Sequence, residues 1–168
     1  MFDSIRRART DLAVMDAVLP AAERLAHADG IPQPGAEHLL LGALELPDGI
    51  ARRALDAVGC DSGALQAALT QGHAAALRAV GVHADDEAIG AAMPAPTQAK
   101  GPLRSQGSLQ TALQRAVELA KDDGVSLGSG HLLLAVIEPE RGTLAGALTR
   151  LGVDRAVLRA EVQRLLAR

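Results

Sequence analysis

The feature that most constrains the fold of this 168-residue chain is an internal repeat. Residues 35–61 read GAEHLLLGALELPDGIARRALDAVGCD, and residues 128–154 read GSGHLLLAVIEPERGTLAGALTRLGVD; they align without a gap. Just upstream, residues 25–31 (LAHADGI) match residues 119–125 (LAKDDGV). The segment between this match and the longer one is one residue shorter in the second copy, a difference that a loop tolerates. The duplication predicts two copies of one helical unit. The identical positions include Gly35 and Gly128, His38 and His131 with the three leucines after each, Gly49 and Gly142, Gly59 and Gly152, and Asp61 and Asp154.

Glycines and apolar spacing divide each copy into four predicted helices. In the first copy, the first helix ends near Gly30, because glycine readily adopts the left-handed conformation at a helix end. A short helix then covers His38–Leu44, a third begins after Gly49 and stops at Gly59, and Asp61 caps the fourth. The corresponding positions of the second copy are Gly124, His131–Ile137, Gly142, Gly152 and Asp154.

Composition indicates the same fold class. Hydrophobic residues make up 48% of the chain, but aromatic residues only 1%, so leucine, valine, isoleucine and alanine must fill the core. Leucine and alanine favour helices, whereas the aromatic and β-branched residues that favour strands are sparse. We therefore expect an all-α protein.

The two copies are separated by a less regular stretch. Residues 76–82 (ALRAVGV) are similar to residues 54–60 and 147–153, which indicates either an additional helix with the same glycine stop or a chance recurrence. Residues 84–108 contain several prolines, glycines and polar residues and read as a flexible linker. The predicted organisation is one domain over residues 1–168, with repeat one at about 4–83 and repeat two at about 109–168.

Charge and cysteine content exclude several classes. The net charge is -3 and aromatic residues are nearly absent, so we expect no nucleic-acid binding. The single cysteine, Cys60, permits no intrachain disulfide and fits a reducing compartment. No apolar run is long enough to span a membrane, and Asp11 and Asp16 interrupt the N-terminal stretch that could otherwise act as a signal peptide. We expect a cytoplasmic protein without membrane contact.

Catalytic signatures are missing from the sequence. There is no phosphate-binding G-x-x-x-x-G-K-[ST] loop and no G-x-S-x-G nucleophile motif, and Cys60 has no evident histidine and acid partners. The paired carboxylates Asp85 and Asp86 fall in the predicted linker, where no pocket would tune their pKa. We predict that the chain is not an enzyme and needs no cofactor.

The repeated pattern resembles a known family. A helix ending in glycine, then G-x-E-H-L-L-L-G, D-G-x-A-x-x-A-L and G-x-D, is similar to the Clp N-terminal domain, the substrate- and adaptor-recognition domain of Clp AAA+ unfoldases. The resemblance covers nearly the whole chain apart from the linker. It implies two pseudo-twofold-related four-helix repeats in one compact bundle, here without the ATPase rings.

The resemblance also indicates candidate binding residues. Glu37 matches the acidic residue of the family's T-E-H motif. In some family members this position resembles part of a pocket that binds phosphorylated arginine. A carboxylate can pair with a guanidinium, and helix-start N–H groups can receive a phosphate. Ala36 replaces the threonine of the motif; in the second copy Ser129 keeps a hydroxyl but Gly130 replaces the glutamate. The alternative is that Glu37 only interacts favourably with the helix dipole.

Three further residues draw attention through the resemblance. His38 and His131 are expected to be structural, half-buried and hydrogen-bonded near a helix start; a metal site would need further ligands, so we predict none. Phe2 corresponds to a phenylalanine that borders an apolar surface between the repeats, where adaptors and cyclic peptide antibiotics dock. Alternatively, Phe2 fastens the first helix to the bundle.

Three hypotheses for function follow. The first is a recognition module that binds a Clp-type AAA+ unfoldase, an adaptor or substrate peptides. The second is a decoy that sequesters ligands such as cyclic peptide antibiotics. The third is a regulatory interaction domain without Clp contact, because a fold does not fix a function.

Overall fold

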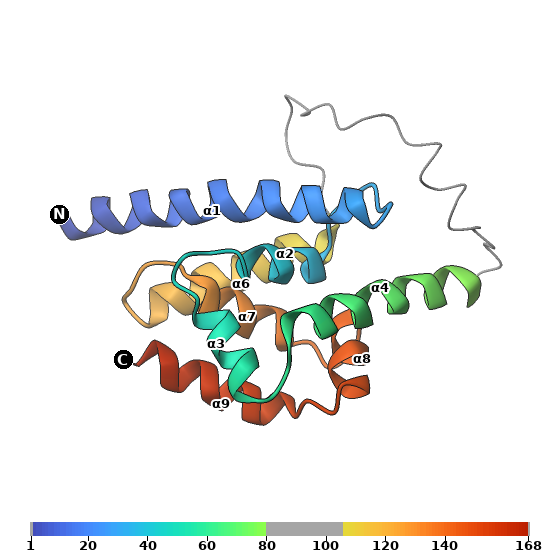
Figure 1. The fold of residues 1–168 in the computed structure, drawn as a ribbon. Coiled ribbons are helices and arrows are strands. Elements are labelled where there is room, and N and C mark those ends of the chain that lie inside the picture. Colours follow the sequence, from blue (N-terminus) through green and yellow to red (C-terminus); the bar gives the residue numbers. More distant parts are fainter. Residues whose placement is uncertain (1, 80–105, 168) are drawn as a thin grey trace.

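The computed structural model describes residues 2–79 and 106–167, and this part of the chain is entirely helical (Figure 1). The all-α prediction and the layout of two repeats are confirmed. The helices are α1 (Phe2–Ala28), α2 (Ala36–Ala43), α3 (Ile50–Ala57) and α4 (Ser62–Ala79) in the first copy, and α6 (Gly107–Asp122), α7 (Ser129–Ile137), α8 (Thr143–Arg150) and α9 (Arg155–Leu166) in the second.

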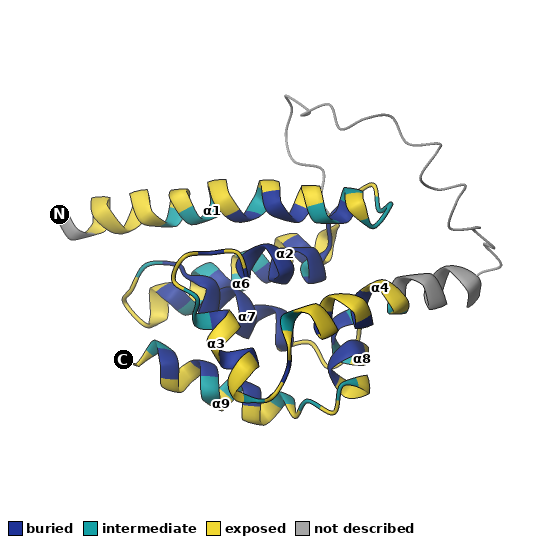
Figure 2. Ribbon diagram, viewed as in Figure 1, coloured by how far each residue is buried: buried dark blue, intermediate teal, exposed yellow. Residues whose placement is uncertain are grey.

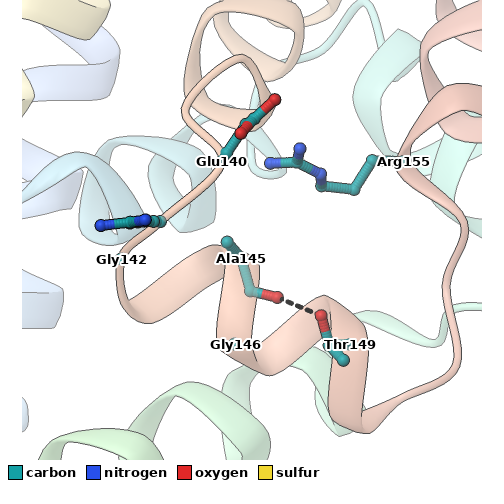
Figure 3. A pocket seen from close by; sticks show the side chains of 7 residues that line it. Glu140, Gly142, Ala145, Gly146, Thr149 and Arg155 are labelled. Atoms are coloured by element: carbon teal, nitrogen blue, oxygen red, sulfur yellow. Dashed lines mark hydrogen bonds between the residues drawn. The ribbon is translucent and has the colours of Figure 1, made fainter.

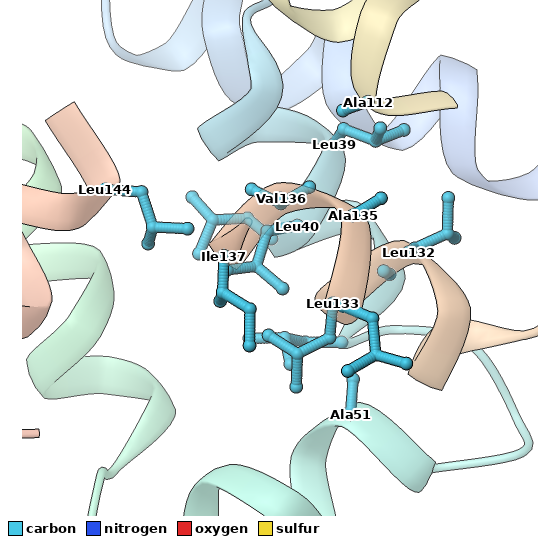
Figure 4. Close-up of a cluster of buried hydrophobic side chains, with 14 of the residues drawn as sticks. Leu39, Leu40, Ala51, Ala112, Leu132, Leu133, Ala135, Val136, Ile137 and Leu144 are labelled. Carbon is cyan, nitrogen blue, oxygen red and sulfur yellow. The ribbon is translucent and has the colours of Figure 1, made fainter. Parts of the chain in front are cut away.

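The centre of the fold is the pair α2 and α7, which pack against each other. Every residue of α7 is buried, as is α2 from Glu37 to Ala43. A helix that is apolar all round must be covered on every side, and the H-L-L-L runs provide that character. Leu39 of α2 and Leu133 of α7 both belong to the main core (Figure 4).

The outer helices exchange partners between the copies. Within each copy the first helix covers the second, so α1 packs on α2 and α6 on α7. The third and fourth helices instead cross over, with α3 against α9 and α4 against α8. Buried residues on these faces include Leu55 of α3 and Leu158 of α9. Neither copy can therefore bury its apolar residues alone.

Helix α1 is the largest departure from pseudo-symmetry. It has 27 residues, whereas its counterpart α6 has 16. Its N-terminal part projects beyond the bundle and exposes Ile5 and Leu12 (Figure 2). Its contacts with the second copy include two hydrogen bonds: Arg7 donates to the Gly124 carbonyl at 2.8 Å, and the Asp11 carboxylate accepts the Leu127 N–H at 2.7 Å.

Most predicted helix ends agree with the structure. Asp61 accepts the N–H of Ala64 at 2.9 Å, and Asp154 caps α9 through the N–H groups of Ala156 and Val157. These contacts confirm both predicted N-caps.

The region between the copies needs one correction. Residues 76–79 continue α4 without interruption, so they do not form a separate helix; the remainder of the predicted 76–82 segment lies outside the described residues. Of the predicted linker, residues 84–105 also lie outside them. Its last residues begin α6, where the Gln106 N–H donates to the Pro34 carbonyl at 3.0 Å. The repeat boundaries themselves stay a prediction.

Replacing a core leucine should test the central packing. Leu133→Ala removes a fully buried side chain from α7 and leaves a cavity, so we expect the free energy of unfolding to fall by about 2–5 kcal/mol. Leu12→Ala, at a position 59% exposed, is the matched control and should change it by less than about 0.5 kcal/mol. Urea denaturation followed by circular dichroism measures both; equal effects would contradict the packing described above.

Candidate functional site at the two central helix starts

The predicted site residues lie at the N-termini of α2 and α7, which we call the paired helix starts. In each, a glycine precedes the helix, and its N–H donates to the Nδ1 atom of the histidine three residues later. The distances are 3.0 Å from Gly35 to His38 and 3.2 Å from Gly128 to His131. Each histidine thereby satisfies a backbone donor that the helix itself leaves without a partner.

Both histidine side chains are fully buried rather than half-buried, which corrects the expectation from the sequence. Each ring is enclosed because it lies between its own helix and the end of the preceding one. The Nε2 atom of His38 lies 3.5 Å from Asp29 Oδ2, and that of His131 lies 3.4 Å from Asp123 Oδ2. Because Nδ1 accepts a hydrogen bond, a neutral ring carries its proton on Nε2, facing the carboxylate. The expected hydrogen bond near a helix start is confirmed.

Burial shifts the protonation equilibrium of the second histidine. It lowers the pKa of His131 from its ordinary value of 6.5, and the nearby Asp123 carboxylate opposes this effect. The folded protein therefore favours the neutral ring, which is the form that can accept the Gly128 N–H.

This pKa shift predicts that acid destabilises the fold. The contribution of His131 to the free energy of unfolding is complete above the unfolded pKa of 6.5. It is lost as the pH falls below 6.5 toward the lower pKa of the folded state, because the unfolded chain then binds the proton more readily than the folded chain. We expect the urea midpoint to decline between neutral pH and about pH 5. His131→Gln keeps an acceptor suited to this position of a helix and should reduce the decline. An unchanged pH profile in this variant would contradict the role of His131.

A carboxylate occupies the same place at each helix start. A Cβ atom added at Gly35 would lie 2.7 Å from Glu37 Oε1, and one added at Gly128 would lie 2.7 Å from Asp48 Oδ2. The first carboxylate comes from the helix itself, whereas Asp48 comes from the α2–α3 loop of the other copy. The positive end of each central helix thus faces a negative group.

Asp48 links the two copies through Ser129. Its carboxylate accepts the Ser129 N–H at 2.7 Å and the Ser129 hydroxyl. The Ser129 Oγ in turn accepts the Ala51 N–H at 3.0 Å, and the whole residue is buried. The candidate hydroxyl of the second copy is therefore engaged inside the protein. Sequence reasoning missed Asp48, because its partner lies 81 residues away.

Gly130 is also determined by packing. A Cβ atom at this position would lie 2.8 Å from Ile50 Cγ2 and 2.9 Å from Leu166 Cδ2. A glutamate here, as in the first copy, would have to displace both side chains. The second helix start therefore has a different chemistry from the first.

The first helix start keeps the acidic group. Glu37 is only 8% exposed, and its Oε1 lies 3.4 Å from His38 Nδ1. The adjacent Ala36 N–H donates to the Ser108 hydroxyl at 3.4 Å, so α6 supplies the hydroxyl that Ala36 lacks. No sequence motif points to Ser108. The four candidates thus divide into Ala36 and Glu37 on one helix start, and Ser129 and Gly130 on the other.

Phe2 and Cys60, which were also considered from the sequence, lie away from the paired helix starts along the chain. Phe2 begins α1, but its side chain lies outside the described part of the structure. Cys60 is buried, and burial raises the pKa of its thiol, with Asp61 and Asp56 adding to the effect. The protonated thiol is a poor nucleophile.

Removing the Asp48 carboxylate should weaken the link between the copies. Asp48→Ala leaves the Ser129 N–H and hydroxyl without their acceptor, and we expect a loss of about 1–2 kcal/mol in the free energy of unfolding. The control is Asp56→Ala on the exposed face of α3, with an expected change below about 0.5 kcal/mol. Thermal and urea denaturation measure both variants; an equal response would sink the proposed link.

The fold and the paired helix starts define an all-helical double-repeat module. The family model described as "Clp repeat (R) N-terminal domain" matches residues 13–94 and 104–168. The chain therefore belongs to the Clp N-terminal domain family, which supports a binding module of the Clp type. In the part of the chain that the structure describes, no helix is long and apolar enough to cross a membrane.

Solved structures agree with this assignment at the level of the fold. One is the N-terminal domain of the caseinolytic protease associated chaperone ClpD from Arabidopsis thaliana, with a TM-score of 0.62 and 16% identity; the match covers 92% of this chain and 93% of that one. Another is the Hsp104 N-terminal domain from Candida albicans, with a TM-score of 0.59 and 13% identity, covering 89% and 86%.

Proposed function

We propose that this chain is a non-catalytic recognition module that binds proteins or peptides in a Clp-type unfoldase system. Its partners would be an AAA+ unfoldase, an adaptor or substrate segments. The observation that carries the proposal is the match of both repeats to the family, in a chain without a phosphate-binding loop. Recognition without ATP hydrolysis is what such a chain can supply.

The α2 start is the better candidate for ligand contact. Its carboxylate belongs to the flexible side chain of Glu37, which could turn outward to meet a guanidinium and free the helix start for a phosphate. At the α7 start, the ligand would have to displace Asp48 from three hydrogen bonds, to the Ser129 N–H and hydroxyl and to the Ile50 N–H. A phosphoarginine-containing ligand would therefore bind at one site rather than two.

Capture of an unfoldase tests the proposal. The immobilised chain should enrich a Clp-type AAA+ unfoldase, or its adaptors and substrates, from a lysate analysed by mass spectrometry. Enrichment should be absent with the Leu133→Ala variant under conditions in which that variant is unfolded. If the folded chain enriches no component of such a system, the proposal is wrong.

Titration with free phosphoarginine tests the site separately. Calorimetry should show one binding event, and Glu37→Ala should weaken it by roughly tenfold or more through loss of a charge-assisted pair. Glu23→Ala, on the exposed face of α1, is the matched control. Equal binding by the Glu37 variant and the parent would remove Glu37 from the site. The decoy and Clp-independent alternatives stay predictions; the Phe2 side chain, on which the test of the decoy alternative depends, lies outside the described residues.

A further inference from the structure

The internal repeat provides its own comparison at the ends of the two central helices. In the first copy, Arg52 of α3 donates from Nη2 to the carbonyl of Leu44, at 2.9 Å. The positions corresponding to Leu44 and Arg52 in the second copy are Ile137 and Ala145. Alanine cannot reach the carbonyls at the end of α7, and a residue from another helix donates to them instead.

That residue is Arg155, from the start of α9. Its Nη1 atom donates to the Pro139 carbonyl and, at 3.4 Å, to the Ile137 carbonyl. These bonds hold the guanidinium in one orientation while leaving its other N–H groups available to a further acceptor. The second copy thus replaces one arginine by another that approaches from a different helix.

This replacement leaves a groove. A hollow of about 530 Å³ lies between the α7–α8 loop, α8 and the start of α9, and the Arg155 guanidinium points into it (Figure 3). Ala145 and Gly146 line it where the first copy carries Arg52 and Arg53. A second hollow of about 250 Å³ shares Arg155 with the first and is also lined by Arg159 of α9. We call the two hollows together the α8–α9 groove.

The charges of the α8–α9 groove are unbalanced. Arg141, Arg155 and Arg159 line it, against the single carboxylate of Glu140. Arg155 and Arg159 are one helical turn apart, and like charges at this spacing destabilise a helix. Among the described residues neither Arg155 nor Arg159 forms an ion pair with a carboxylate, whereas Arg24, Arg115 and Arg164 do.

We propose that the α8–α9 groove binds an acidic peptide segment, with carboxylate side chains on Arg155 and Arg159. The small side chains at Ala145 and Gly146 allow a peptide backbone to approach closely. A peptide fits better than a nucleic acid, because the chain has a net charge of -3 and one aromatic residue. This surface goes beyond the proposed function, since it lies at the opposite end of α7 from its helix start.

Fluorescence anisotropy with a labelled peptide rich in Asp and Glu tests the proposal in the full chain. A matched peptide with Asn and Gln should bind much more weakly. Added salt should weaken binding of the acidic peptide, because it screens the charges. Arg159→Glu should reduce affinity roughly three- to tenfold by replacing attraction with repulsion. Ala145→Leu places a larger, uncharged side chain in the hollow without changing the charge and should also reduce binding.

Arg53→Glu is the control, since it makes the same charge change at the exposed counterpart of Gly146 in the first copy. Circular dichroism confirms that each variant is folded. Equal loss in Arg53→Glu and Arg159→Glu would overturn the proposal, as would equal binding of the acidic and amide peptides. Binding of heparin or RNA without binding of the acidic peptide would also overturn it. None of these results would affect capture of an unfoldase, so the two proposals can fail independently.

Discussion

The hydrogen bond from an N-cap glycine to a buried histidine is the interaction on which this fold depends. The N-cap residues of α2 and α7, Gly35 and Gly128, are buried, so their N–H groups need an acceptor from the protein. His38 and His131 each supply an acceptor on one ring nitrogen and face an aspartate with the other. With this polar requirement met locally, the leucines that follow are free to form one core shared by both copies.

Exchange of helices between the copies makes the module a single unit. Because α3 packs on α9 and α4 on α8, a substitution in one copy alters the packing of the other copy. The contact between Asp48 and Ser129 is an example, in which a loop of the first copy completes a helix start of the second. The backbone thus keeps its pseudo-symmetry, while side chains at equivalent positions of the two copies make different contacts.

That divergence places the two candidate binding surfaces in different copies. The first copy keeps Glu37 at its helix start and carries Arg52 on α3, where it donates to the Leu44 carbonyl. The second copy closes its helix start with Asp48 and opens the space beside α8, where Ala145 stands in place of the arginine. A duplicated scaffold can separate two recognition tasks in this way without altering its core, because the residues concerned lie at helix ends and on the surface.

The sequence by itself determined the helical class, the duplication and most helix ends, because glycine stops, aspartate caps and apolar spacing are local. Asp61 and Asp154 could be assigned from neighbours within a few residues. Full burial of the histidines, the contact between Asp48 and Ser129, and the substitution of Arg155 for Arg52 were decided only by the tertiary structure. They depend on which helices lie side by side, and the exchange of α3 and α4 between copies brings together residues that no local pattern connects.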